Sequence, residues 1–297
     1  MLTVAARKAI TELATRILAD KLVPAEVLAL IPAHMPLVIA KKYPGNAEGA
    51  QAELMQEALE CARRGEIVVR VSRSSLAAGL LHILPLVRKL KQGDPFLYGR
   101  GGEEVLFFRK HGFEPLVIPG VSSALAGPSF VGIPVTQRGA AESLVICTGV
   151  GRGGKSVSLP SYSRSRMLVI LMGVARLSSI LSHLQKQGYP NYVPIAIVER
   201  ASSPDQRLIA GTLEGIERVL ASSEVGEQRT PGMIVVGWAV LSLDGSKGDL
   251  DVLDDASRED INEDGLEKLD MVRVNRWLGG KYGIIRDGLT SEWEQFV

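Results

Sequence analysis

The chain has 297 residues, of which 46% are hydrophobic and 23% are charged, and its formal net charge at pH 7 is +1. This is the composition of an ordinary soluble protein, and the length is sufficient for one large or two medium α/β domains. The near-zero net charge gives no field that would favour nucleic acid or an anionic membrane as a partner.

In chain order, short apolar runs rich in Val and Ile alternate with segments of helical periodicity. Near-continuous apolar runs are typical of strands covered on both faces. Strands that alternate with helices predict an α/β fold with parallel or mixed sheets. The predicted elements are strand 37–40, helix 47–66, strands 67–71, 115–120, 143–149 and 167–173, helix 176–188, strand 194–199, helix 213–223 and strand 233–237.

The two cysteines, Cys61 and Cys147, lie in apolar periodic segments. We therefore expect buried free thiols and a reducing, cytoplasmic location. The sequence has no CxxC or HExxH spacing, and its four histidines are scattered, so we expect no metal site. Residues 1–10 lack the apolar region of a signal peptide, and the most apolar window, 75–87, is too short to span a bilayer.

A glycine-rich loop, QGDPFLYGRGGEE at 92–104, precedes a helix-like segment. Glycine permits positive φ and close approach of a ligand to the backbone. The loop has the spacing of neither GxGxxG nor GxxxxGKS, so a nucleotide phosphate is not its predicted guest. Asp94, in a Gly-Asp-Pro turn, can accept hydrogen bonds from a ligand amine or from backbone N–H groups; a purely structural turn is the alternative.

Three further motifs accompany this loop: VIPGVSSALAGPSFVGIPVTQRG at 117–139, LMG at 171–173 and PDQR at 204–207. Together they resemble the uroporphyrinogen-III C-methyltransferases of the tetrapyrrole methylase superfamily, most closely the fungal members. The resemblance runs from Leu2 to about Trp238. It implies two α/β domains with S-adenosylmethionine in the cleft between them, a homodimer, and methylation of uroporphyrinogen III to precorrin-2 in sirohaem biosynthesis.

On this basis we expect an N-terminal domain at 1–116, a C-terminal domain at 117–245, and an acidic linker and tail at 246–297. Residues 248–265 hold eight acidic residues and one Arg, which is typical of a solvated linker. The two Trp residues beyond it predict that the end of the tail docks on the domain.

The resemblance also implies the residues that would contact S-adenosylmethionine, with no metal involved. They come from the glycine loop, from the segment after VIPG, from LMG and from ERA at 199–201. The family usually has Gly where Gln92 stands. The expected contacts are Gln92, Gly93, Asp94, Leu97, Ser122, Ser123, Met172 and Ala201.

The chemistry requires alignment of a pyrrole carbon with a sulfonium methyl, and then loss of a proton from the methylated macrocycle. By resemblance, Asp20 of DKLV would accept that proton and Lys42 of AKKYPG would act as a donor. As alternatives, Asp20 could equally cap a turn, and Lys42 could do no more than contact a propionate of the substrate.

Uroporphyrinogen carries eight carboxylates, so its site should be locally basic. Arg100 and Arg138 are the substrate-binding candidates because a guanidinium binds a carboxylate in bidentate fashion. Lys41 and Arg152 are weaker candidates. For each Arg, a solvated surface position is the alternative.

Two departures from the family pattern stand out. The family has a first strand and a GPGDP-like turn before the residues that match MLTV, the first four residues of this chain. Residues 71–89 interrupt a segment that is continuous in the family, between Arg70 and Leu90. We interpret 71–89 as a translated in-frame intron, with an inserted amphipathic helix as the alternative. A catalytically impaired chain that binds a partner, or a methylase of a later corrin intermediate or of the diphthamide precursor, is the functional alternative.

Overall fold

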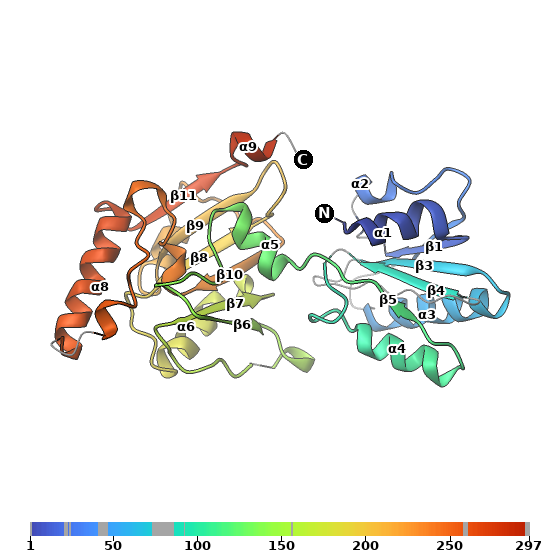
Figure 1. Ribbon diagram of the computed structural model, residues 1–297, viewed down its shortest axis with the longest axis horizontal. Helices are drawn as coiled ribbons and strands as arrows, with labels where there is room; N and C mark the ends of the chain where they lie inside the picture. The colour runs from blue at the N-terminus through green and yellow to red at the C-terminus, as the bar shows by residue number, and fades with distance from the viewer. Residues whose placement is uncertain are drawn as a thin grey trace. The chain divides into compact units, whose positions relative to one another are not determined.

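The computed structural model describes residues 2–20, 23, 25–40, 47–72, 86–91, 93–155, 157–257 and 261–294. Internal contacts divide the chain into two compact units, Met1–Ser123 and Ala124–Val297, which are drawn in Figure 1. Both units combine a sheet with helices, as predicted.

Unit 1 contains a five-stranded parallel sheet in the order β2-β1-β3-β4-β5. Helices cover both faces of this sheet: α1 and α2 lie on one face and α3 and α4 on the other (Figure 1). The strands are β1 Arg16–Asp20, β2 Leu37–Ala40, β3 Ile67–Ser72, β4 Leu86–Lys91 and β5 Leu116–Val117. The helices are α1 Val4–Lys8, continued by η1 Ala9–Leu13, then α2 Ala25–Leu28, α3 Ala47–Arg63 and α4 Gly101–Lys110.

Side-chain alternation along β1 explains why both faces are covered. Ile17 and Ala19 belong to the core against α1 and η1, whereas Leu18 belongs to the core against α3. Successive side chains of a strand point to opposite faces, so an apolar run buries both. On the α3 and α4 face, Arg70 of β3 forms an ion pair at 3.0 Å with Glu104 of α4, and both side chains are buried.

The segment 71–89 is described only at its ends. Val71 and Ser72 complete β3, and Leu86–Lys91 forms β4, which runs parallel to β3 with Ile67 opposite Leu86. Residues 73–85 lie outside the described residues. The described ends are thus strands, whereas a genuine insertion was expected to be helical.

Unit 2 contains a six-stranded mixed sheet in the order β11-β9-β8-β10-β7-β6. Among the described strands of this unit, β6 and β7 pair in parallel, and the other pairs are antiparallel. The strands are β6 Ser143–Thr148, β7 Arg166–Leu171, β8 Pro194–Glu199, β9 Arg207–Thr212, β10 Gly232–Val236 and β11 Gly283–Asp287. The helices are α5 Ser123–Phe130, α6 Leu177–Lys186, α7 Ile216–Leu220, α8 Glu263–Leu278 and α9 Ser291–Glu294, with short turns η2 Arg152–Gly154, η3 Val174–Arg176, η4 Trp238–Val240, η5 Gly245–Lys247 and η6 Asp255–Ser257.

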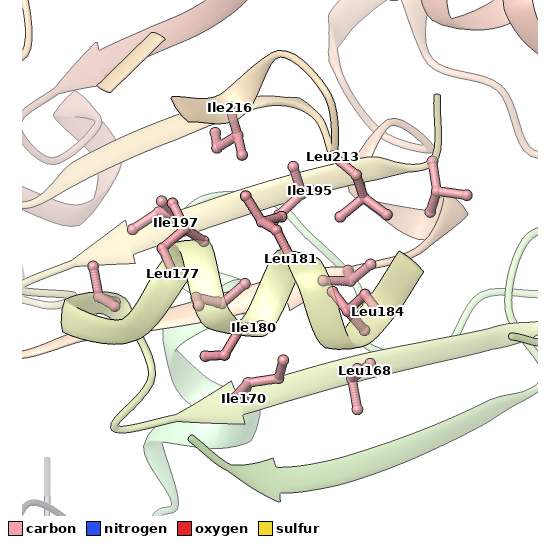
Figure 2. Packing of buried hydrophobic residues seen from close by; sticks show 14 of the residues in the cluster. Leu168, Ile170, Leu177, Ile180, Leu181, Leu184, Ile195, Ile197, Leu213 and Ile216 are labelled. Atoms are coloured by element: carbon pink, nitrogen blue, oxygen red, sulfur yellow. The ribbon is translucent and has the colours of Figure 1, made fainter. Parts of the chain in front are cut away.

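The core of unit 2 forms where α6 lies on the sheet (Figure 2). Leu177, Ile180, Leu181 and Leu184 recur at the spacing that places side chains on one helix face. These four residues are buried against strands β7 and β8 (Figure 2). Cys61 and Cys147 are both free; Cys61 is buried and Cys147 is half-buried.

The segment predicted to be a solvated acidic linker is in part buried. Asp249 and Asp255 have side chains only 10% and 11% exposed, and both pair with Arg273 of α8. Their charge is therefore neutralised by Arg rather than by water, which the acidic composition alone did not indicate. As predicted, both Trp residues of the tail dock: Trp277 is buried, and the ring of Trp293 lies 4.6 Å from that of Phe130 in α5.

Candidate active site

In unit 1, the glycine loop after β4 is closed by the carboxylate of Asp94. Its Oδ1 accepts a hydrogen bond from the backbone N–H of Phe96 at 2.9 Å, and its Oδ2 accepts one from Gly120 at 3.4 Å. An Asp that bonds the backbone two residues on favours a turn. Asp94 thus shapes the loop and ties it to the chain after β5.

Gly120 makes the approach of these two segments possible. A Cβ atom at this position would lie 1.6 Å from the carbonyl oxygen of Gly93. Any side chain here would collide with main chain, which cannot rotate away as a flexible side chain can. The two segments at which resemblance implies cofactor contacts, 93–97 and 122–123, are therefore neighbours within unit 1.

Positive φ angles at residues other than glycine coincide with the predicted cofactor segments. Among the described residues they occur at Tyr98, Arg100, Met172, Arg200 and Ser202. Each such residue costs of the order of 1–3 kcal/mol and persists only where its surroundings hold it. Tyr98 and Arg100 lie in the glycine loop, Met172 is itself a predicted contact, and the other two flank Ala201. Strain of this kind is concentrated at functional sites.

In unit 2, the turns that carry Met172 and Ala201 emerge at one edge of the sheet. Met172 follows β7 and Arg200 follows β8, and both strands run antiparallel to β10, which lies between them. The carboxyl ends of β7 and β8 therefore share an edge, and two strand spacings place these turns roughly 10 Å apart. Arg200 N–H also donates to the carbonyl of Pro231, just before β10, at 2.8 Å.

Gln206 of the PDQR motif fastens the Ala201 turn to helix α5. Its side chain is buried; Oε1 accepts from the N–H of Ser202 at 3.0 Å, and Nε2 donates to the carbonyl of Phe130 at 3.4 Å. Its carbonyl accepts from the N–H of Gly288, just after β11, at 2.7 Å. Gln206 thus joins the strained turn and α5 through its side-chain amide, and the tail through its backbone carbonyl. The sequence singled out PDQR only as a family motif and assigned no role to Gln206.

The remaining predicted cofactor contacts lie on these same segments. Leu97 is half-buried in the glycine loop, and Ala201 is half-buried in its turn. Ser123 is the exposed first residue of α5, and Ser122 directly precedes it. The structure brings together the contacts within each unit: Gly93, Asp94 and Leu97 in one, Met172 and Ala201 in the other.

The candidates for substrate binding and proton transfer are more scattered. Arg100 is bound by a carboxylate of its own segment, since its Nε lies 2.9 Å from Oε2 of Glu103. Arg138 is exposed in a turn closed by hydrogen bonds between Gln137 and Ala141. Asp20 is the last residue of β1, opposite Ala40 of β2. Lys41, Lys42 and Gln92 lie outside the described residues.

Across the described ranges, no group of three or more His, Cys, Asp or Glu side chains is arranged to hold a metal ion. Nor does any helix in these ranges have the length and apolarity needed to cross a membrane.

Strand β6, which pairs with the strand that precedes Met172, contains Cys147. Burial raises the pKa of the Cys147 thiol above its ordinary value. Cys147 therefore remains a neutral, apolar side chain at physiological pH.

Comparison with known proteins identifies the family. The family model for Tetrapyrrole (Corrin/Porphyrin) Methylases matches residues 86–217. The uroporphyrinogen-III C-methyltransferase of Methanocaldococcus jannaschii is 34% identical over 82% of this chain and 93% of its own length. The chain belongs to the tetrapyrrole methylases. The probable uroporphyrinogen-III C-methyltransferase of Schizosaccharomyces pombe is 46% identical to this tetrapyrrole methylase over 82% of the chain, but the match covers only 44% of the yeast protein.

Solved structures show the same fold. The uroporphyrin-III C-methyl transferase of Thermus thermophilus, crystallised with S-adenyl homocysteine, aligns with a TM-score of 0.60 and 33% identity. The alignment covers 80% of this tetrapyrrole methylase and 91% of the Thermus chain. The resemblance read from the sequence motifs is therefore confirmed at the level of family and fold.

Proposed function

We propose that this chain is a S-adenosylmethionine-dependent C-methyltransferase that converts uroporphyrinogen III to precorrin-2, the step that leads to sirohaem. The observation that carries the proposal is the 34% identity to the Methanocaldococcus enzyme over nearly all of that enzyme's length. The 46% identity to the fission-yeast protein, of which this chain spans less than half, supports the same activity. The Thermus relative, crystallised with S-adenyl homocysteine, supports the choice of methyl donor.

The backbone geometry fits such a donor. S-adenosylmethionine supplies a methyl group already activated by a positively charged sulfur. In unit 2, the strained turns at Met172 and at Ala201 expose main chain at the carboxyl ends of β7 and β8. In unit 1, the loop at Gly93 exposes main chain that carries no side chain at that position. Carbonyl oxygens held in this way complement a sulfonium charge without a metal.

The protein's main task is alignment, because both reactants carry their own reactivity. The pyrrole carbon bonds to the methyl carbon as the carbon–sulfur bond breaks, and S-adenosylhomocysteine leaves. The methylated ring is cationic until it loses a proton. We propose Asp20 as the acceptor of that proton and Lys42 as a donor, with Arg100 and Arg138 binding substrate carboxylates. Arg100 would have to exchange Glu103 for the substrate.

For the cofactor we propose contacts from Gln92, Gly93, Asp94, Leu97, Ser122, Ser123, Met172 and Ala201. Asp94 would act through loop shape, since both of its oxygens already accept backbone N–H groups. A homodimer and a cytoplasmic location complete the proposal.

Incubation of the purified chain with uroporphyrinogen III and methyl-labelled S-adenosylmethionine tests this function. We expect two labelled methyl groups per macrocycle and the absorption spectrum of precorrin-2 or its oxidised form. Label transferred only to a later corrin intermediate would indicate a sister methylase instead. No transfer to any tetrapyrrole, with S-adenosylhomocysteine still bound, would indicate a catalytically impaired chain.

A further inference from the structure

A second glycine-rich loop, at 149–155, follows strand β6; among its residues the sequence singled out only Arg152, as a weaker substrate-binding candidate. Its sequence is GVGRGGK. The loop is closed on itself: Gly151 N–H donates to the carbonyl of Lys155 at 2.9 Å, and Gly154 N–H donates to Gly151 at 3.0 Å. These two hydrogen bonds fix the conformation of the loop.

This loop touches the turn that carries Met172. A Cβ atom at Gly149 would lie 2.4 Å from Cα of Gly173 and 3.1 Å from the carbonyl oxygen of Met172. Strands β6 and β7 are parallel, with Thr148 opposite Leu171, so the chain leaves both strands at the same edge. Ligands of α/β sheets bind outside the carboxyl ends of such strands.

The loop and its neighbour carry cations that no described carboxylate neutralises. Arg176 donates from Nη1 to the carbonyl of Gly154 at 2.8 Å, and Lys155 is exposed. Neither forms an ion pair with a described Asp or Glu, and residues 149–155 and 173–176 contain no acidic residue. Elsewhere in unit 2, arginines are commonly paired with carboxylates: Arg164, Arg200, Arg207, Arg229, Arg273, Arg276 and Arg286.

We propose that the loop 149–155, together with Arg176, binds a carboxylate arm of the tetrapyrrole. The inference rests on the proposed function, which places the methyl donor at Met172 and an octacarboxylate beside it. Ammonium and guanidinium groups bind carboxylates through charge-assisted hydrogen bonds. Glycine at most of the loop positions lets such an arm approach the backbone.

A nucleotide phosphate is the competing guest, because residues 149–156 match the spacing GxxxxGKS. In phosphate-binding loops of that type, the Lys opens a helix whose N-terminus receives the phosphate. Here Lys155 is extended, and residues 157–163 contain no helix. The conformation therefore favours a carboxylate held by side chains.

The test compares Lys155→Gln and Lys155→Glu with Lys186→Gln, which alters another exposed lysine of unit 2, at the end of α6. The probe is uroporphyrin III, the oxidised octacarboxylate, which is titrated by fluorescence at low and high salt. We expect Lys155→Glu to weaken uroporphyrin binding about tenfold or more, as loss of a hydrogen bond to a charged group does, and Lys155→Gln to weaken it less. Lys186→Gln should match the wild type, and all three variants should keep the wild-type affinity for S-adenosylhomocysteine.

Unchanged uroporphyrin affinity in Lys155→Glu would overturn the inference, as would tight ATP binding that this variant abolishes. Either result would leave the proposed methylation intact if the wild type still methylates uroporphyrinogen III. Conversely, Lys155-dependent uroporphyrin binding by a chain that transfers no methyl group would support the loop and overturn the proposed function. A wild type that binds no uroporphyrin and transfers no methyl group to uroporphyrinogen III would overturn both.

Discussion

Gly120 shows how a single residue controls the glycine loop of unit 1. Because a Cβ atom there would lie 1.6 Å from the Gly93 carbonyl, Gly120→Ala must push the two segments apart. We expect a loss of about 1–3 kcal/mol or more in the free energy of unfolding, and markedly weaker binding of S-adenosylhomocysteine. Thermal unfolding and titration calorimetry measure both effects.

Gly102→Ala is the matched control for this substitution. Gly102 lies in α4, and a Cβ atom there would meet nothing within 4 Å. The control should be neutral or stabilising by up to about 1 kcal/mol, because alanine favours helix. If Gly120→Ala behaved like Gly102→Ala in both measurements, the close contact between the two segments would be refuted.

Gln206 offers a sharper test of the predicted cofactor contacts in unit 2, which are Met172 and Ala201. Gln206→Leu keeps the size of the side chain but leaves the Ser202 N–H and the Phe130 carbonyl without their partner. We expect a loss of about 1–3 kcal/mol in stability, and an affinity for S-adenosylhomocysteine reduced several-fold because the Ala201 turn relaxes.

Gln185→Leu serves as the control, since Gln185 is exposed and its side chain donates to Oδ1 of Asn191 at 3.3 Å on the surface. A purely structural role for Gln206 would lower stability and leave cofactor affinity unchanged below the unfolding temperature. That outcome would remove Gln206 from the positioning of the site.

At the scale of elements, charge joins the acidic linker to helix α8 of the tail. Asp249 bonds to Arg273 and to Arg276, both in α8. Burial acts to raise the pKa of Asp249, but the hydrogen bonds from Arg273 and from the N–H of Asp251 outweigh it, so the pKa is lowered. The contribution of Asp249 to stability is therefore fully present above the unfolded pKa of about 4 and is lost as pH falls through the lower folded pKa.

Asp249→Asn tests this pH dependence. The difference in unfolding free energy between wild type and variant should be constant above about pH 5 and should shrink below about pH 4. Denaturant unfolding at a series of pH values gives the two curves. Parallel curves throughout the acid range would mean that Asp249 is not ionised in a pair with α8.

Burial explains only some of the elements that sequence reasoning found and missed, since the buried strands β1 and β9 were also missed. All seven predicted strands are present. The Val- and Ile-rich runs of β3, β7, β8 and β10 are buried, whereas Leu37 and Ile39 of β2 and Leu116 of β5 are exposed. β11 was missed because it is an edge strand with Arg286 and Asp287 exposed, so it lacks an apolar run. α8 was missed because acidic residues mask its buried face, which includes Trp277.

From the residues alone, the candidate site could be predicted only where glycine marks an unusual backbone conformation. The loop at Gly93 could be predicted from composition alone, and Met172 and Ala201 only by resemblance. The positive φ of Met172, Arg200 and Ser202 has no local signal, since these residue types rarely adopt it. The Gln206 network joins positions distant in sequence, 130, 202, 206 and 288, which no spacing rule connects.

For the whole molecule, the family indicates the expected function, and the length of the chain determines how much of each relative it matches. This tetrapyrrole methylase spans 44% of its fission-yeast relative and 93% of its Methanocaldococcus relative. The predicted cofactor contacts are divided between the two units, Met1–Ser123 and Ala124–Val297. The proposed function requires that predicted contacts from both units bind the same methyl donor.

An experimental structure of the full chain with S-adenosylhomocysteine is the most direct measurement of that requirement. We expect the ligand to contact main chain of the Gly93–Leu97 loop and, at the same time, the turns that carry Met172 and Ala201. A ligand held by one unit alone, a ligand bound elsewhere, or no binding at millimolar concentration would contradict a methyl-donor site built from both units.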